Sequence, residues 1–228
     1  MTAALKDCLG IVASYAFVCA LIAVSTLLVR RGALKPAEAR KVIHIGVSHW
    51  WLLAMFMIDD PWVASIGPFS FIFINALALR FRLLPVMDRD AGARNWGTVY
   101  FPISILVLVN LCWRQVLPLW VGAIAVLVLG WGDGCAALVG GRARGPGMRI
   151  WRARKTLEGS AAMLAASFAV ILVLTLLFNP RFSGLLSAAG AAILVAAAVT
   201  VVELVTPLGI DNLTIPLACA ALYQGFFA

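Results

Sequence analysis

The chain has 228 residues, of which 63% are hydrophobic and 12% charged, and its formal net charge is +8. A soluble globular domain carries roughly 45–50% apolar and about 25% charged residues, so this composition excludes a soluble protein and predicts a polytopic membrane protein. No polar stretch is long enough for a second domain, and we expect one integral-membrane domain over residues 1–228. The positive charge is expected to set membrane topology rather than to bind nucleic acid.

Eight runs of the sequence lack Asp, Glu, Lys and Arg and are long enough to predict membrane-spanning helices, which need about 20 apolar residues. In chain order they cover 8–29, 42–58, 61–79, 95–113, 115–132, 159–180, 182–202 and 212–228. The fifth helix is expected to continue past Asp133 to about Val139, and the seventh past Glu203 to about Val205. The predicted fold class is therefore all-α, with about eight transmembrane helices.

Basic residues are distributed unevenly among the connections between these runs. Segments 30–41, 80–94 and 140–158 hold fifteen of the eighteen Lys and Arg residues. Because positively charged loops are retained in the cytoplasm, we expect these three connections to face inward and both termini to face outward. The protein is accordingly expected in the cytoplasmic (inner) membrane.

Four acidic residues stand at the inner ends of predicted helices: Asp133, Glu158, Glu203 and Asp211. A carboxylate at the centre of a membrane helix costs about 2.5–3.5 kcal/mol on insertion. Each one alone is explained by a buried ion pair or by a position at the interface. Four of them at one depth, beside the basic loops, instead predict a functional site at the cytoplasmic membrane edge.

The stretch GWGDG at 130–134 places Asp133 among three glycines. Close packing of small residues between membrane helices explains glycines of this kind. It does not explain an aspartate among them, whereas a broken or closely approached helix does, because irregular backbone at this depth is tolerated where it lines a cavity. Both explanations are kept for Gly130, Gly132 and Gly134.

The connection after this helix, GGRARGPGMRIWRARKTLEGS, is rich in glycine and arginine. Glycines let backbone N–H groups turn towards an anion, and arginine binds phosphate through two parallel hydrogen bonds. The alternative is a cytoplasmic loop that only follows the positive-inside rule. Lys155, Thr156 and Glu158 then enter a helix, whose N-terminus favours phosphate. The GxxxxG spacing in this connection lacks the Lys-Ser/Thr pair of a P-loop, so phosphate binding is predicted without a soluble nucleotide-binding fold.

Arg40, Lys41 and His44 stand at the inner start of the second predicted helix. Arg40 and His44 are four residues apart and share one helix face. The two cations are explained by long side chains that anchor a helix end at the interface. His44, whose residue type changes its charge near neutral pH, favours a contact with a site instead.

The stretch VELVTPLGIDNLTIP places Glu203 eight residues before Asp211 and Asn212, in a short turn between the last two predicted helices. Carboxylate and amide oxygens suit Mg²⁺, together with water and substrate phosphates. The same turn is also explained by a capped helix start, with Asp211 or Asn212 as the N-cap. The two explanations are compatible.

Four motifs stand in order between residues 40 and 216: RKVIH at 40–44, GDGCAALVGGRARG at 132–145, RKTLEGS at 154–160 and VELVTPLGIDNLTIP at 202–216. Together they resemble the polytopic lipid-alcohol kinases, the family of phytol kinase, dolichol kinase and CTP-dependent diacylglycerol kinase. The resemblance implies transfer of a nucleotide γ-phosphate, usually from CTP, to the hydroxyl of a membrane alcohol, with Mg²⁺ as the metal. The small number of spans favours a phytol-sized alcohol over a very long polyprenol.

For this chain the resemblance implies three groups of site residues. The expected catalytic residues are Asp133, Lys155 and Glu158. Asp133 is expected to be a metal ligand or the base that accepts the alcohol proton, and Glu158 is expected to orient Lys155 or Arg154. The expected nucleotide and phosphate contacts are Arg40, Lys41, His44, Gly140, Gly141, Arg142, Arg144, Gly145, Arg154, Thr156 and Ser160. The expected Mg²⁺ ligands are Asp133, Glu203, Asp211 and Asn212.

Two other functions are kept as alternatives. A phosphatidate cytidylyltransferase, which forms CDP-lipids, would use the same nucleotide, with a lipid phosphate as the attacking group. A membrane transporter built on broken helices would place its charged residues at the bilayer centre and on both faces, whereas here they gather on one. The Ala-rich faces of the last two helices could also pack against a second copy, so a homodimer is kept as an expected partner.

Overall fold

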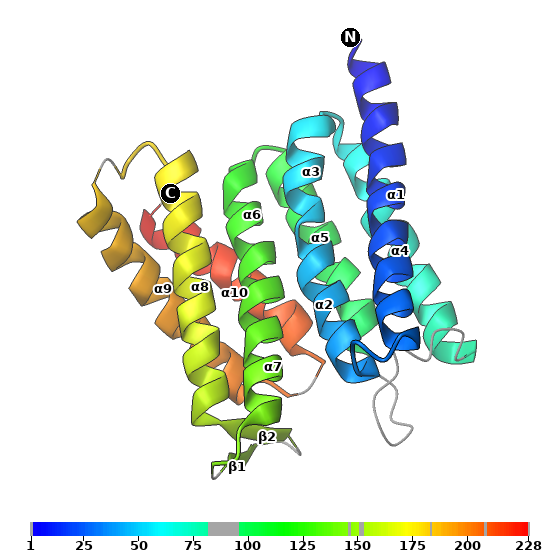
Figure 1. Ribbon diagram of the computed structural model, residues 1–228. Coiled ribbons are helices and arrows are strands. Elements are labelled where there is room, and N and C mark those ends of the chain that lie inside the picture. Colours follow the sequence, from blue (N-terminus) through cyan, green and yellow to red (C-terminus); the bar gives the residue numbers. More distant parts are fainter. Residues whose placement is uncertain are drawn as a thin grey trace.

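The apolar runs fold into helices that pass between two ends of the molecule (Figure 1). The computed structural model describes residues 2–81, 96–145, 147–150, 153–182, 184–207 and 209–227. In these ranges the elements are α1 (Ala3–Arg30), α2 (Pro36–Ser48), α3 (Trp50–Met57), α4 (Pro61–Phe81), α5 (Gly97–Trp113), α6 (Leu119–Leu127), η3 (Val128–Asp133), α7 (Gly134–Arg142), β1 (Gly147–Ile150), β2 (Ala153–Thr156), α8 (Leu157–Phe178), α9 (Leu185–Val205) and α10 (Asp211–Phe227).

Some of these helices continue one another. α3 follows α2 after a break at His49, and α6, the π-helical segment η3 and α7 form one continuous rod. Counted in this way, the described ranges contain eight helical rods, one for each predicted span. α1, α4, α8, α9 and the rod Leu119–Arg142 are long and apolar enough to cross a bilayer, and α5 is a shorter apolar helix. Eight membrane crossings stay a prediction.

The N-terminus and the C-terminal end of α10 lie at the same end of the bundle, opposite to the β1–β2 hairpin (Figure 1). Near the termini, the Asp7 carboxylate accepts the Asp59 N–H at 2.7 Å, and Asn179 donates to the Phe227 carbonyl at 3.0 Å. The described parts of the basic connections after α1 and α7 lie at the opposite end, which we call the hairpin end. The termini thus share one end, as the charge alternation requires; that this end faces outward stays a prediction.

The described residues are mostly helical, in agreement with the all-α prediction, and the connection between α7 and α8 adds two short antiparallel strands. Gly147 pairs with Thr156, and Ile150 pairs with Ala153. Backbone groups that leave a helix need new hydrogen-bond partners. The two strands supply these partners for each other, where the sequence predicts an open glycine-rich loop.

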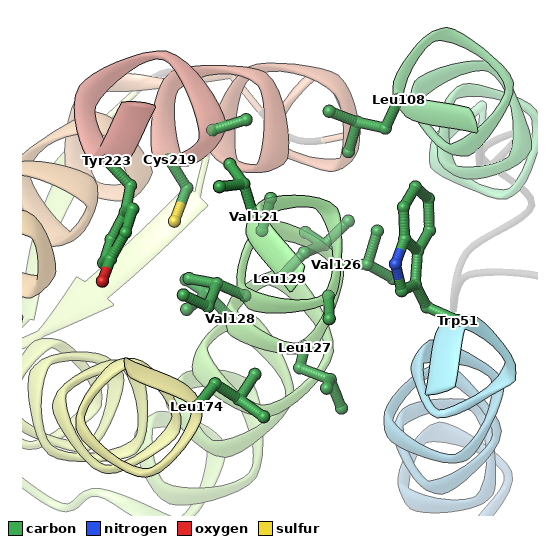
Figure 2. Close-up of a cluster of buried hydrophobic side chains, with 14 of the residues drawn as sticks. Trp51, Leu108, Val121, Val126, Leu127, Val128, Leu129, Leu174, Cys219 and Tyr223 are labelled. Atoms are coloured by element: carbon green, nitrogen blue, oxygen red, sulfur yellow. The ribbon is translucent and has the colours of Figure 1, made fainter. Parts of the chain in front are cut away.

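The rod made of α6, η3 and α7 is the central helix of the bundle. Every residue from 121 to 130 is buried. Figure 2 shows α6 enclosed by side chains from four other helices: Trp51 of α3, Leu108 of α5, Leu174 of α8 and Tyr223 of α10. In α1 and α4, by contrast, few residues are fully buried and most are exposed or partly exposed. Asp133 therefore stands near the end of an enclosed helix rather than on one that faces lipid.

The glycines beside Asp133 bring two neighbouring helices against the central rod. A Cβ atom at Gly130 would collide with Ser48 on α2, and one at Gly132 would lie 2.6 Å from the Met163 sulfur on α8. η3 is also π-helical throughout, and single π-helical turns inside helices are frequent at functional sites. The glycines therefore allow close packing, and Asp133 lies on a closely approached, π-helical segment rather than on a broken helix.

Gly130→Ala is expected to destabilise the protein by about 1–3 kcal/mol, the usual cost of overfilling a packed interface. The added methyl group would have to displace the Cβ of Ser48, which is fixed to the α2 backbone. Gly190→Ala is the matched control, because nothing lies within 4 Å of a Cβ atom at that position on α9. Thermal unfolding in detergent measures the difference, and equal melting temperatures would contradict the close approach of α2 to η3.

Candidate active site

A pocket that is partly open to solvent lies between α1, α2, α4 and α5. Most of its charged and amide side chains gather towards the hairpin end, where η3 and α10 join the lining. The charged and amide side chains of the lining are Arg40, Lys41, His44, Asn75, Asp133, Asp211 and Asn212. The remaining walls are mostly apolar, and we call this part the apolar channel; it includes Val18, Ile22, Val47, Trp50, Gly67, Phe71, Phe101 and Ile105. The pocket therefore joins a charged head to an apolar channel.

Asp133 is the centre of the charged head. It is buried, with Lys41 Nζ 2.6 Å and His44 Nε2 3.5 Å from the same carboxylate oxygen, Oδ2. Lys41 and His44 are three residues apart on α2, so their side chains lie on the same side of that helix. His44 Nε2 is buried and makes no hydrogen bond with any described residue. Because buried polar atoms normally have partners, this nitrogen is suited to a polar group of a substrate.

Asp211 opens α10 and lines the same pocket. Its Oδ1 accepts hydrogen bonds from the Gly209 N–H at 3.1 Å, from the Asn212 N–H at 2.9 Å and from the Asn212 amide at 2.9 Å. Gly209 has a φ of +94°, a left-handed conformation that glycine adopts without a steric cost. The turn is thus a hydrogen-bonded helix start that also places oxygen atoms in the pocket.

Lys155 and Glu203 form a buried ion pair between β2 and α9. The Lys155 ammonium contacts the Glu203 carboxylate and also donates to the Glu203 backbone carbonyl at 3.0 Å. The two side chains are 12% and 6% exposed. Neither residue belongs to the pocket lining around Asp133. The pair therefore fixes the end of β2 to the end of α9, beside the charged head.

Glu158 is expected to orient Lys155 or Arg154, and this role stays a prediction. It is exposed in the first turn of α8, while Lys155 is engaged on α9. The Arg154 guanidinium donates to the carbonyl oxygens of Gly145, at 2.7 Å, and of Ala143. Neighbouring residues of a strand point to opposite faces, so Lys155 turns towards α9 and Arg154 turns towards the preceding connection.

The first part of the predicted phosphate loop is helical. Gly140, Gly141 and Arg142 form the last turn of α7 instead of an open nest of N–H groups. A Cβ atom at Gly140 would lie 3.4 Å from the Gly159 Cα, so these glycines let α7 and α8 touch. Thr156 Oγ1 accepts the Gly159 N–H at 3.1 Å and caps α8. Packing and capping thus account for Gly140 and Thr156.

Arg142 is held by Glu38, a residue that the sequence analysis missed. The two side chains approach to 2.6 Å and join the first turn of α2 to the last turn of α7. The hydrogen bond from Arg142 keeps the pKa of the Glu38 carboxyl below its usual value. Glu38 is the single acidic residue in the basic connection at 30–41. This feature of the sequence could have marked it as an ion-pair partner. Arg144 and Ser160 also lie at this end, before β1 and in the first turn of α8.

Mg²⁺ is the metal that the resemblance implies. Among the described residues, no three His, Cys, Asp or Glu side chains are grouped as a ready-made metal site. Asp133, Asp211 and Asn212 nonetheless line one pocket. Mg²⁺ usually binds through one or two carboxylates with water and substrate phosphates rather than in a cage of protein ligands, so these three residues fit it. Glu203, the fourth predicted ligand, is instead the partner of Lys155.

Curated relatives cover most of the chain, whereas no family model and no solved structure matches it. A phytol kinase of Synechocystis sp. is 35% identical over 196 residues, which are 86% of this chain and 82% of the relative. A probable chloroplastic phytol kinase 2 of Glycine max is 29% identical over 87% of this chain. A probable chloroplastic phytol kinase of Triticum aestivum is 30% identical over 84% of this chain, and the match covers 68% of each plant protein. In agreement with its four motifs, the chain belongs to the phytol kinase family.

Proposed function

We propose that this chain transfers the γ-phosphate of CTP to the hydroxyl of a phytol-like isoprenoid alcohol at the cytoplasmic face of the inner membrane. The observation that carries the proposal is the pocket, in which an apolar channel leads to Asp133, Lys41 and His44. Ligand sites are mostly apolar with a few polar groups that fix orientation. A lipid alcohol matches this arrangement, because it has a long apolar chain and one hydroxyl. The similarity to phytol kinases supports the same reaction.

In the proposed mechanism the hydroxyl of the alcohol lies beside Asp133. The alcohol oxygen forms a bond to the γ-phosphorus while the bond from that phosphorus to the β–γ bridging oxygen breaks, and CDP leaves with the bonding electrons. The Asp133 carboxylate accepts the hydroxyl proton, and His44 Nε2 contacts the same hydroxyl. Bound Mg²⁺, held by Asp211 and Asn212, would supply neutralisation of phosphate charge.

The nucleotide is proposed to bind at the hairpin end. Arg40 and Lys41 line the pocket, while Arg142, Arg144 and Arg154 are exposed on the connection that follows the central rod. Phosphoryl transfer depends mainly on positioning and on neutralising charge, and these cations supply both for a triphosphate. One substrate dissolved in lipid and one dissolved in water would then meet at Asp133.

The test uses purified protein in detergent with Mg²⁺, γ-labelled CTP and a panel of lipid alcohols, with unlabelled ATP and UTP as competitors. The proposal expects a phytol-sized alcohol to become labelled. An excess of unlabelled CTP should reduce the amount of label, whereas unlabelled ATP and UTP should change it little. Label from α-labelled CTP in phosphatidate would instead establish a cytidylyltransferase. If no lipid becomes labelled and the protein instead moves a substrate across the membrane of vesicles, the kinase proposal is wrong and the protein is a transporter.

A further inference from the structure

The apolar channel ends blind inside the bundle. Its lining stops at about the same level on each surrounding helix, at Ser14 and Tyr15 of α1, Trp50 of α3, Gly67 of α4 and Ile105 of α5. Each of these helices continues for at least six more residues towards the chain termini. The channel therefore reaches only part of the way through the molecule.

Packed side chains fill the space beyond that level. Ala54 on α3, Ala64 on α4 and Leu108 on α5 are completely buried and do not line the pocket. Further along, the Trp113 indole N–H donates to the Ile58 carbonyl at 3.0 Å and ties α5 to the end of α3. A chain that enters from the charged head is therefore stopped by the protein and does not run on to the other end.

Tyr15 closes the side of the channel near this blind end. Its hydroxyl lies 2.6 Å from the Ser70 hydroxyl, and its ring stacks on Phe71 with 5.8 Å between ring centroids. Both partners belong to α4, so the contact joins α1 and α4 across the channel wall. The blind end is thus bounded by packed residues on the side of the chain termini, and by Tyr15 between α1 and α4.

The depth of the channel limits the chain that it can hold. Lys41 and Trp50 are nine residues apart along α2 and α3, which corresponds to about 13 Å at the rise of a helix. An extended isoprene unit spans roughly 5 Å, since it contributes four chain bonds of about 1.5 Å in a zigzag. The channel accordingly takes two to three extended units, and a longer chain must fold back within the pocket or is excluded.

Gly67 is the position where this limit can be moved. It lines the channel, and a Cβ atom there would meet only Trp50, at 3.8 Å, which is an ordinary contact. A small side chain at this position is therefore tolerated, and a larger one would occupy the blind end. We propose that Gly67, together with Trp50 and Tyr15, forms a length stop that selects alcohols of about three isoprene units when extended, or four when folded back, and rejects long polyprenols.

This inference rests on the proposed function, and the experiment separates the two. kcat/KM is measured for C10, C15, C20 and C55 isoprenoid alcohols with the wild type, Gly67→Ala, Gly67→Leu and the control Gly190→Leu, whose position on α9 is open. We expect the wild type to favour C15 and C20 over C55. Gly67→Leu should lower the C20/C10 ratio of kcat/KM at least tenfold, Gly67→Ala should lower it less, and Gly190→Leu should leave it unchanged.

If Gly67→Leu is active and keeps the wild-type C20/C10 ratio of kcat/KM, the length stop is wrong and the kinase proposal still stands. A wild type that phosphorylates none of the alcohols would contradict the kinase proposal instead. In that case a C15 alcohol with a photoreactive diazirine at its tail still tests the length stop. Crosslinks to peptides that contain Tyr15, Trp50 or Gly67, lost in Gly67→Leu, would support it, and crosslinks confined to the lipid-facing sides of the helices would overturn it.

Discussion

Replacing Asp133 with asparagine is expected to lower the rate of phosphate transfer by about 10²–10⁴-fold, the contribution of a positioned general base. Asparagine has nearly the same shape as aspartate and can still accept a hydrogen bond from Lys41, which lies 2.6 Å from the carboxylate in the wild type. It cannot accept the hydroxyl proton. The loss should therefore appear in kcat with labelled CTP and a lipid alcohol, while the protein remains folded.

Asp59→Asn is the matched control for this variant. Asp59 also pairs with a lysine, Lys6 of α1, at 2.6 Å, but it is exposed and does not belong to the pocket lining. We expect its kcat to stay within a factor of two of the wild type. Melting temperatures of both variants separate a catalytic loss from unfolding. An Asp133→Asn enzyme that keeps more than a tenth of the wild-type kcat would exclude Asp133 as the base.

Replacing Glu203 with glutamine is expected to destabilise the protein by about 3–5 kcal/mol, because it leaves the buried ammonium of Lys155 without its counter-charge. The side chains of the pair are 12% and 6% exposed, so water can do little to solvate the remaining charge. The free energy of unfolding in detergent measures this effect. Glu38→Gln is the control, since its partner Arg142 is 75% exposed, and only a small change in melting temperature is expected there.

The double variant Lys155→Met/Glu203→Leu tests what the ion pair is for. Replacing a buried ion pair with apolar side chains of similar size is often neutral or stabilising, so we expect this variant to regain the stability that Glu203→Gln loses. If Lys155 also binds phosphate, as the sequence predicts, the stable double variant should remain poorly active with a raised KM for CTP. Full activity of the double variant would show that the pair is purely structural.

The helices were predictable from the sequence because hydropathy is a local property. The run at 61–79 lies within α4 (Pro61–Phe81), and α9 ends at Val205, as predicted. The central rod extends to Arg142, three residues past the predicted Val139. The β1–β2 hairpin was missed because strand pairing in a short charged connection leaves no apolar pattern. Its backbone pairing depends on where α7 ends and α8 begins.

The candidate site was predictable only as a set of residues. Asp133, Lys41 and His44 were all singled out from the sequence, yet nothing in it shows that Lys41 is the partner of Asp133 across 92 positions of the chain. Glu203 was grouped with Asp133 as a metal ligand because both are acids at the same predicted depth. The structure assigns Glu203 to Lys155. Depth can be inferred from the sequence, whereas the direction in which a helix presents a side chain depends on tertiary packing.

The π-helical segment η3 makes the position of Asp133 depend on residue number as well as on residue type. A π-helical turn contains more residues than an α-helical one, so η3 behaves as an α-helix with a residue inserted. Deleting one residue from 128–132 would remove this extra residue and restore an α-helical turn, with α6 and α7 in nearly the same relative orientation. Converting η3 to an α-helix without a deletion would instead rotate α7 against α6 by about 100°. Asp133 would then turn away from Lys41 while α6 keeps its packing. A single-residue gap at η3 in an alignment is thus compatible with an unchanged direction of Asp133, because the π-helical turn accommodates the additional residue.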